Sequence, residues 1–172
     1  IISCLPKLLT YRIKTNLEPK MNYFQEVGFS VSDFVDILST QPGILYYSLD
    51  SAIRPAVEAL REIMGSNENV VTILKASRRN SFPAINHNLV RNVSFLRAQG
   101  CPLEYIRKCI LQNGPSFVRK HESFKDMAAR AEVEWGVSPR TALYPVAVHV
   151  LCCLKERTME SKCRLFESFG WD

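Results

Sequence analysis

Cations concentrated in the middle of the chain are the feature that most directly suggests a chemistry. Residues 75–120 include nine lysines and arginines against one acidic residue, whereas residues 33–68 include two arginines against six acidic residues. Binding to a nucleic-acid backbone requires cations spread along a surface, because the phosphates supply most of the affinity. The basic segment therefore predicts an anionic partner. The candidate binding residues are Lys75, Arg78, Arg79, Arg91, Arg97, Arg107, Lys108, Arg119 and Lys120.

Two pairs among these cations are the strongest candidates. Arg78 with Arg79, and Arg119 with Lys120, are expected in turns between helices, where long side chains reach solvent. Arginine suits phosphate because its planar guanidinium can make two hydrogen bonds to one group. Isolated arginines on helices, such as Arg97, have the alternative role of covering apolar flanks with their aliphatic stems.

Patterns for catalysis or metal binding are missing from the sequence. It contains no phosphate-cradling glycine loop, no nucleophile elbow and no zinc-protease helix. His149 and Cys153 lie four residues apart and would share a helix face, but structural zinc sites normally have four ligands. We therefore expect neither an enzyme nor a cofactor.

Length and composition predict one globular domain. The 172 residues are 47% hydrophobic and 23% charged, which suits a packed core rather than disorder. The longest apolar run, residues 143–154, is shorter than the ~20 residues that span a bilayer, so we expect no membrane partner. The sequence begins with isoleucine and shows no targeting segment. We expect a single domain over residues 1–172, as a fragment truncated at both ends.

Prolines recur at a spacing that indicates a repeat. Pro6 and Pro42 are 36 residues apart, and Pro115 follows Pro42 after 73 residues, about two periods. Pro19 and Pro55 are also 36 residues apart. Since a proline inside a helix removes a hydrogen bond, prolines in this register predict turns between helices and first turns of helices.

Glycines mark the end of each repeat. They follow apolar segments of helical period at intervals of 37, 35, 36 and 34 residues, and glycine after the last periodic residue signals a helix end. Each unit thus contains two helices and a proline-marked turn. About four and a half such units predict an all-α superhelical solenoid of roughly 35-residue helical repeats. The closing glycines are Gly28, Gly65, Gly100, Gly136 and Gly170.

The phased motifs resemble the mitochondrial transcription termination factor (mTERF) family, and its plant organellar branch in particular. The resemblance is carried by "YFQEVGFSVSDFVDILSTQPGILYYSLDSAIRPAVEALREIMGS" and by the closing segment "VLCCLKERTMESKCRLFESFGWD". It extends over essentially the whole chain. One departure is Arg78, which stands where the third unit would have its proline.

This resemblance implies a monomeric superhelix that binds nucleic acid in mitochondria or chloroplasts. Members of the family bind double-stranded DNA and act in transcription termination or initiation, which is the function we expect. Some plant members instead support RNA processing and intron splicing, so organellar RNA is the alternative partner.

A protein-interaction scaffold of the tetratricopeptide kind is the alternative of another class. Its period is similar, but its "W-x₂-L-G-x₂-Y" signature is missing here, and a scaffold has no need of the basic segment. Pentatricopeptide RNA-binding proteins share the period but lack the proline between helices.

Overall fold

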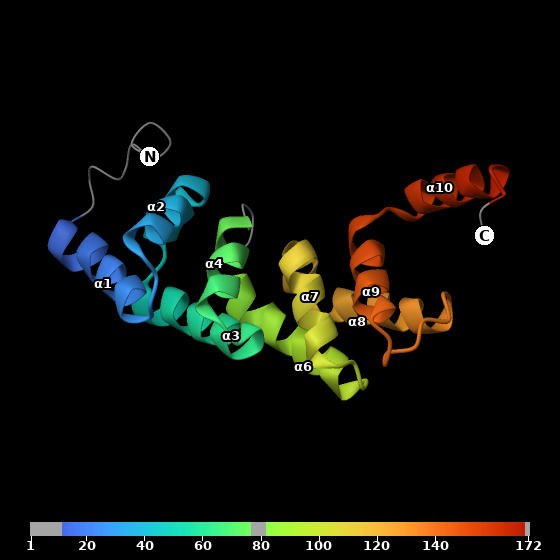
Figure 1. Ribbon diagram of the computed structural model, residues 1–172, viewed down its shortest axis with the longest axis horizontal. Coiled ribbons are helices and arrows are strands. Elements are labelled where there is room, and N and C mark those ends of the chain that lie inside the picture. Colours follow the sequence, from blue (N-terminus) through green and yellow to red (C-terminus); the bar gives the residue numbers. More distant parts are fainter. Residues whose placement is uncertain (1–11, 77–81, 171–172) are drawn as a thin grey trace.

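The computed structural model describes residues 12–76 and 82–170, and their regular structure is entirely helical. The predicted all-α solenoid is confirmed. In Figure 1 the first helices of successive units stand side by side in a row. Neighbours in this row are in contact along the whole molecule. The first helices are α2 (Val31–Thr40), α4 (Asn67–Ala76), α7 (Leu103–Asn113) and α9 (Leu143–Cys153).

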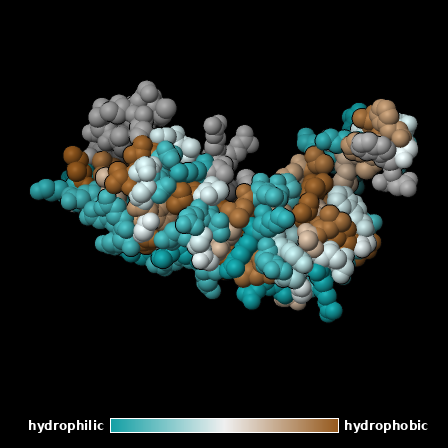
Figure 2. All heavy atoms as spheres, in the orientation of Figure 1, coloured by the Kyte–Doolittle hydropathy of each residue, from teal (hydrophilic) through white to brown (hydrophobic). Residues whose placement is uncertain are grey.

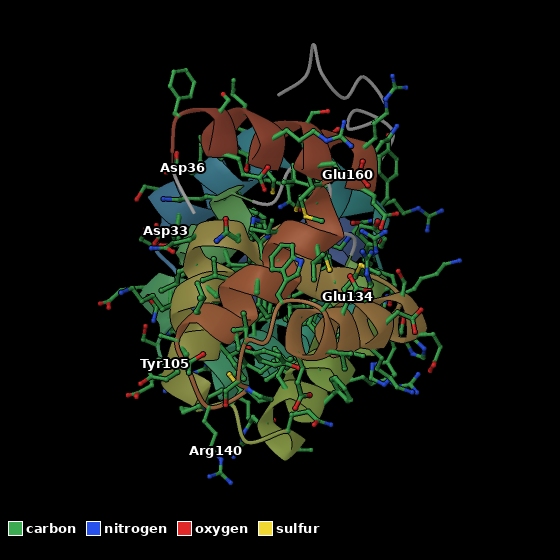
Figure 3. The ribbon with its side chains drawn as sticks, turned by 90° about the vertical axis from the view of Figure 1, so that its right-hand side faces the viewer. Asp33, Asp36, Tyr105, Glu134, Arg140 and Glu160 are labelled. Carbon is green, nitrogen blue, oxygen red and sulfur yellow. The ribbon has the colours of Figure 1, made fainter. Side chains whose placement is uncertain are left out.

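The second helices form the other layer. Viewed along the long axis, Asp33, Asp36 and Tyr105 of the first helices lie on one side, and Glu134, which follows α8, lies on the opposite side (Figure 3). The last of these helices, α10, projects beyond the rest at the C-terminal end (Figure 1). The second helices are α1 (Glu18–Glu26), α3 (Arg54–Met64), α6 (Val90–Ala98), α8 (His121–Val133) and α10 (Glu156–Ser168).

Three second helices are preceded by a π-helical turn, so they begin earlier than the sequence predicts. These turns, η2 (Ile13–Leu17), η4 (Leu49–Ile53) and η5 (Ile85–Leu89), recur every 36 residues, and η5 follows the short helix α5 (Phe82–Ala84). Glu18 and Arg54 each donate to a carbonyl five residues back. The prolines that follow them have no N–H to donate. The π turn does not require proline, because η5 is followed by Val90 and Arg91.

The proline-marked turns are 3₁₀ helices, η3 (Pro42–Tyr46) and η6 (Gly114–Val118). Pro42 is the first residue of η3, after α2 has ended, so it interrupts no α-helix. Ile44 and Phe117 are almost completely buried, at 1% and 0% exposure. Each turn therefore contributes a side chain to the core.

Helix ends follow local sequence signals. Ser30 and Asp33 form a capping box at the start of α2, in which each side chain bonds the other residue's backbone N–H. All five closing glycines have positive φ, as a left-handed helix terminus requires. In the described part of the chain, no helix is both long and apolar enough to cross a membrane.

Candidate nucleic-acid interface

The junction between α6, η6 and α8 brings cations of two consecutive units together. Arg119 joins η6 to α8, Lys120 is the N-cap residue of α8, and both are exposed. Arg91 is an exposed residue in the first turn of α6. Its neighbour Asn92 is completely buried and donates from Nδ2 to the carbonyls of Phe117, at 2.8 Å, and Arg119, at 2.9 Å. One buried amide thus holds the Arg119–Lys120 turn against α6.

The same attachment occurs two units earlier. Lys20 on α1 is 4% exposed and donates from Nζ to the carbonyl of Leu45 in η3, at 2.7 Å, and to Oδ1 of Asn16, at 2.6 Å. Burial lowers the pKa of Lys20. The separation of 25 residues between Lys20 and Leu45 equals that between Asn92 and Phe117. A polar side chain on a second helix therefore positions the 3₁₀ turn of the following unit.

Arg119 also fastens α8 to α9. Its Nη1 donates to the carbonyl of Cys152 in the last turn of α9, and its Nε donates to Oγ of Ser123 at 3.0 Å. Capping the end of α9 uses part of the guanidinium, which has five N–H donors in all. The remaining donors are available to an anion, because Arg119 is exposed. Arg119 therefore has a structural task beside its predicted binding role.

Arg107 forms a hydrogen bond to the end of a neighbouring helix. Its Nε donates to the carbonyl of Ile63 at 2.6 Å, in the last turn of α3. The guanidinium lies against Gly65, where an added Cβ would be 3.2 Å from Nη2. The sequence placed Arg107 among the phosphate contacts, but the structure shows it capping α3.

Lys75 is paired with two acidic residues of α2. Its Nζ lies 2.8 Å from Oδ2 of Asp36 and 3.2 Å from Oδ1 of Asp33. The hydrogen bond to Asp36 is the largest cause of a raised pKa at Lys75, and the bond to Asp33 adds to it. Two carboxylates surround this charge, so Lys75 is a weaker candidate for phosphate than the sequence suggested.

Five of the predicted residues are exposed and form no ion pair with an acidic side chain of the described residues. Arg97 lies in the last turn of α6, at the opposite end of that nine-residue helix from Arg91, and Lys108 lies on α7. The structure therefore does not gather all the predicted cations into one site. Arg78 and Arg79 lie outside the described residues. Among the nine predicted residues, those that are exposed and form no ion pair with a described residue are Arg91, Arg97, Lys108, Arg119 and Lys120.

Sequence reasoning missed a set of residues that reach the closing glycines. Asn67 donates from Nδ2 to the carbonyl of Val27 at 2.6 Å, beside Gly28. Arg140 lies against Gly100, at 3.7 Å from the position of an added Cβ, and projects at the lower edge of the molecule in Figure 3. With Arg107 at Gly65, they show that each of these glycine turns is covered by a polar residue about 40 positions later. No local motif signals such a contact.

Two phenylalanines at the inter-helix turns belong to the core. Phe82 and Phe117 are 1% and 0% exposed, and Tyr47 packs on Phe82 with ring centroids 5.7 Å apart. Tyr46 is 53% exposed. Phe82 and Phe117 therefore pack within the core, and these two rings cannot stack on bases.

His149 and Cys153 do share a face of α9, as predicted. Nδ1 of His149 lies 3.5 Å from Sγ of Cys153 and 2.9 Å from Oγ of Ser116. Burial raises the pKa of the Cys153 thiol. Within the described ranges, no three histidine, cysteine or acidic side chains are grouped to hold a metal ion. This pair therefore offers contacts within the fold rather than a reactive thiolate.

The hydropathy of the surface changes along the length of the molecule. Hydrophilic residues cover most of the side shown in Figure 2 from α1 to α7, and hydrophobic residues gather around α9.

A model of one protein family, described as mTERF, matches residues 1–172. No curated protein and no solved structure matches the chain.

Proposed function

The chain belongs to the mTERF family of nucleic-acid-binding, organellar helical-repeat proteins, and we propose that it binds double-stranded DNA and regulates transcription in a mitochondrion or chloroplast. The observation that carries this proposal is the junction of α6, η6 and α8. There Asn92 holds the exposed Arg119 and Lys120 beside the helix that bears Arg91. A fixed group of cations on a stacked superhelix suits a regular phosphate backbone.

Duplex DNA is favoured over single strands by the burial of Phe82 and Phe117. Proteins that bind single strands combine a basic groove with aromatic side chains on which bases stack. Phe82 and Phe117, at the inter-helix turns, are both inside the core. Cations without these rings support contact with the backbone rather than with unpaired bases.

Occupancy of the duplex by this protein would by itself be enough to regulate transcription. A superhelix bound along the duplex would obstruct a polymerase, and no catalytic step is needed. The alternative partner is organellar RNA, with a role in splicing or RNA processing. Phosphate contacts serve both nucleic acids.

The test is an anisotropy titration with labelled duplex DNA, single-stranded RNA and hairpin RNA of matched length at two salt concentrations. The double variant Arg91→Glu with Lys120→Glu should weaken duplex binding and reduce the slope of log K against log salt by about 1.8, if each residue contacts one phosphate. Lys162→Glu, an exposed lysine on α10, is the matched control. It should leave the slope unchanged.

The other outcomes separate the alternatives. A preference for either RNA would replace the DNA proposal with the splicing role. No binding at low salt would leave the protein-interaction scaffold as the better account. Equal losses in the double variant and in Lys162→Glu would remove the junction from the interface.

A further inference from the structure

The buried amide of Asn92 determines which nitrogen of His121 carries a proton. Nδ2 of Asn92 faces two backbone carbonyls, and carbonyls only accept hydrogen bonds. This orientation turns the acceptor Oδ1 toward Nδ1 of His121, 2.8 Å away. Nδ1 must therefore be the donor of that bond. In the neutral imidazole, Nε2 is then the unprotonated nitrogen.

Nε2 is open to solvent although the ring is held in place. The ring of His121 packs edge-on against Phe95, with centroids 6.0 Å apart and planes at 85°. The side chain is half-buried, and its one hydrogen bond within the described chain is through Nδ1. Every buried side-chain nitrogen and oxygen in that part of the chain has a partner. Since Nε2 has none, water or a ligand reaches it.

The charges around this ring are mostly positive. Arg119 and Lys120 precede His121 directly, and Arg91 is carried by α6, the helix that packs against the ring. On its own helix, Glu122 is paired with Lys125 at 3.2 Å. The further charged or titratable residues of the elements packed around the ring are Asp126, Arg130 and Glu132 on α8, Arg97 on α6 and the exposed His87 on η5.

We propose that His121 contacts a nucleic-acid phosphate through Nε2, and that binding takes up one proton at this atom. The proposal rests on the nucleic-acid binding proposed above and assigns a further residue to that interface. A neutral Nε2 can only accept a hydrogen bond and so repels phosphate oxygen. Protonation by solvent converts it to a charged donor, while the Nδ1 bond to Asn92 stays intact.

The sign of the pH dependence follows from this geometry. An anion beside the ring favours the imidazolium. Because binding takes up a proton at Nε2, affinity must rise as pH falls. A single linked proton limits the gain to about tenfold per pH unit.

The experiment is a titration of the full chain with duplex DNA at fixed salt between pH 5.5 and 8.5. The wild type should gain up to about tenfold in affinity per pH unit, and His121→Gln should lose this gain. His87→Gln removes another exposed histidine and should retain the gain. An unchanged pH profile in His121→Gln overturns the proposal.

A measurement on the wild type removes dependence on the variant's folding. Nitrogen-15 NMR of the histidine rings should show the neutral ring of His121 protonated at Nδ1 in the free protein, and Nε2 should gain a proton when duplex is added. If the protonation of Nε2 does not change when duplex is added, the contact is refuted, even if DNA binds. A wild type that binds no nucleic acid at any pH refutes the proposed function as well, so the two failures are distinguishable.

Discussion

Replacing Asn92 by leucine is expected to lower the free energy of unfolding by about 3 kcal/mol, at about 1 kcal/mol for each hydrogen bond. The buried amide donates to the carbonyls of Phe117 and Arg119 and accepts from Nδ1 of His121. Leucine has a similar size, so loss of volume contributes little. The leucine side chain leaves the carbonyls of Phe117 and Arg119 and Nδ1 of His121 without their partner. Residue 92 is 0% exposed.

The effect is large enough to measure by thermal unfolding. For a chain of this length, 1 kcal/mol corresponds to about 2–4 °C, so the midpoint should fall by roughly 6–12 °C. Circular dichroism at neutral pH is a suitable probe because the fold is helical. Ser94→Ala, on the exposed side of the same helix, is the control and should stay within about 0.5 kcal/mol of the wild type.

One result would refute the reasoning about this amide. If Asn92→Leu unfolds within about 0.5 kcal/mol of the wild type, the three hydrogen bonds do not fix the turn. The positioning of Arg119 and Lys120 would then need another explanation. A stability loss together with weaker DNA binding is the expected combination.

Two further perturbations test the helix ends. Gly65→Ala should cost about 1–2 kcal/mol in urea unfolding, because φ is +75° and the new Cβ would lie 3.2 Å from the guanidinium of Arg107. The second is acid unfolding of Asp33→Asn. Hydrogen bonds from Ser30 are the largest cause of a lowered pKa at Asp33, and Lys75 adds to it. Because the folded-state pKa of Asp33 is lowered, the ionised carboxylate stabilises the fold at pH values above its usual pKa of 3.8. This stabilisation is lost as pH falls through the folded-state pKa. Asp33→Asn lacks this contribution at every pH, so the variant should lose less stability than the wild type below about pH 4.

Controls for these two experiments come from the same chain. Gly136 has φ +65° with no atom within 4 Å of an added Cβ, so Gly136→Ala isolates the backbone cost. A loss at Gly65 smaller than at Gly136 would contradict the proposed role of the Arg107 contact. Asp50, a highly exposed partner of Arg54 at 3.6 Å, serves as the control carboxylate. The acid limb of Asp50→Asn should match the wild type; an Asp33→Asn limb that does the same would contradict the prediction.

Much of the fold could be predicted because its signals are local. Pro42 marks the end of α2 by lacking an N–H, and Gly65 marks the end of α3 by tolerating positive φ. Ser30 and Asp33 identify the first turn of α2 from side-chain chemistry alone. The π turns were missed, because a wider turn that ends two residues before Pro19 or Pro55 leaves no distinct pattern in the side chains.

The candidate site could be predicted only in part. The sequence identified the basic segment, and Lys120 and Arg91 are indeed exposed. It did not reveal Asn92, which looks like an ordinary polar residue of a helix. The spacing of 25 residues that Asn92–Phe117 shares with Lys20–Leu45 is the signal that could have found it, once the repeat register was known.

The sequence by itself determined the repeat, its period, the order of helices and turns, and the surplus of cations, because each depends on backbone preferences or on composition. Only the tertiary structure decided which cations are bonded to other groups of the chain and which are not. Arg107 reaches Ile63, Lys75 reaches Asp33, and Arg119 reaches Cys152, across 44, 42 and 33 residues. Such partners meet only when units stack, and the stacking angle depends on core packing that no single repeat contains.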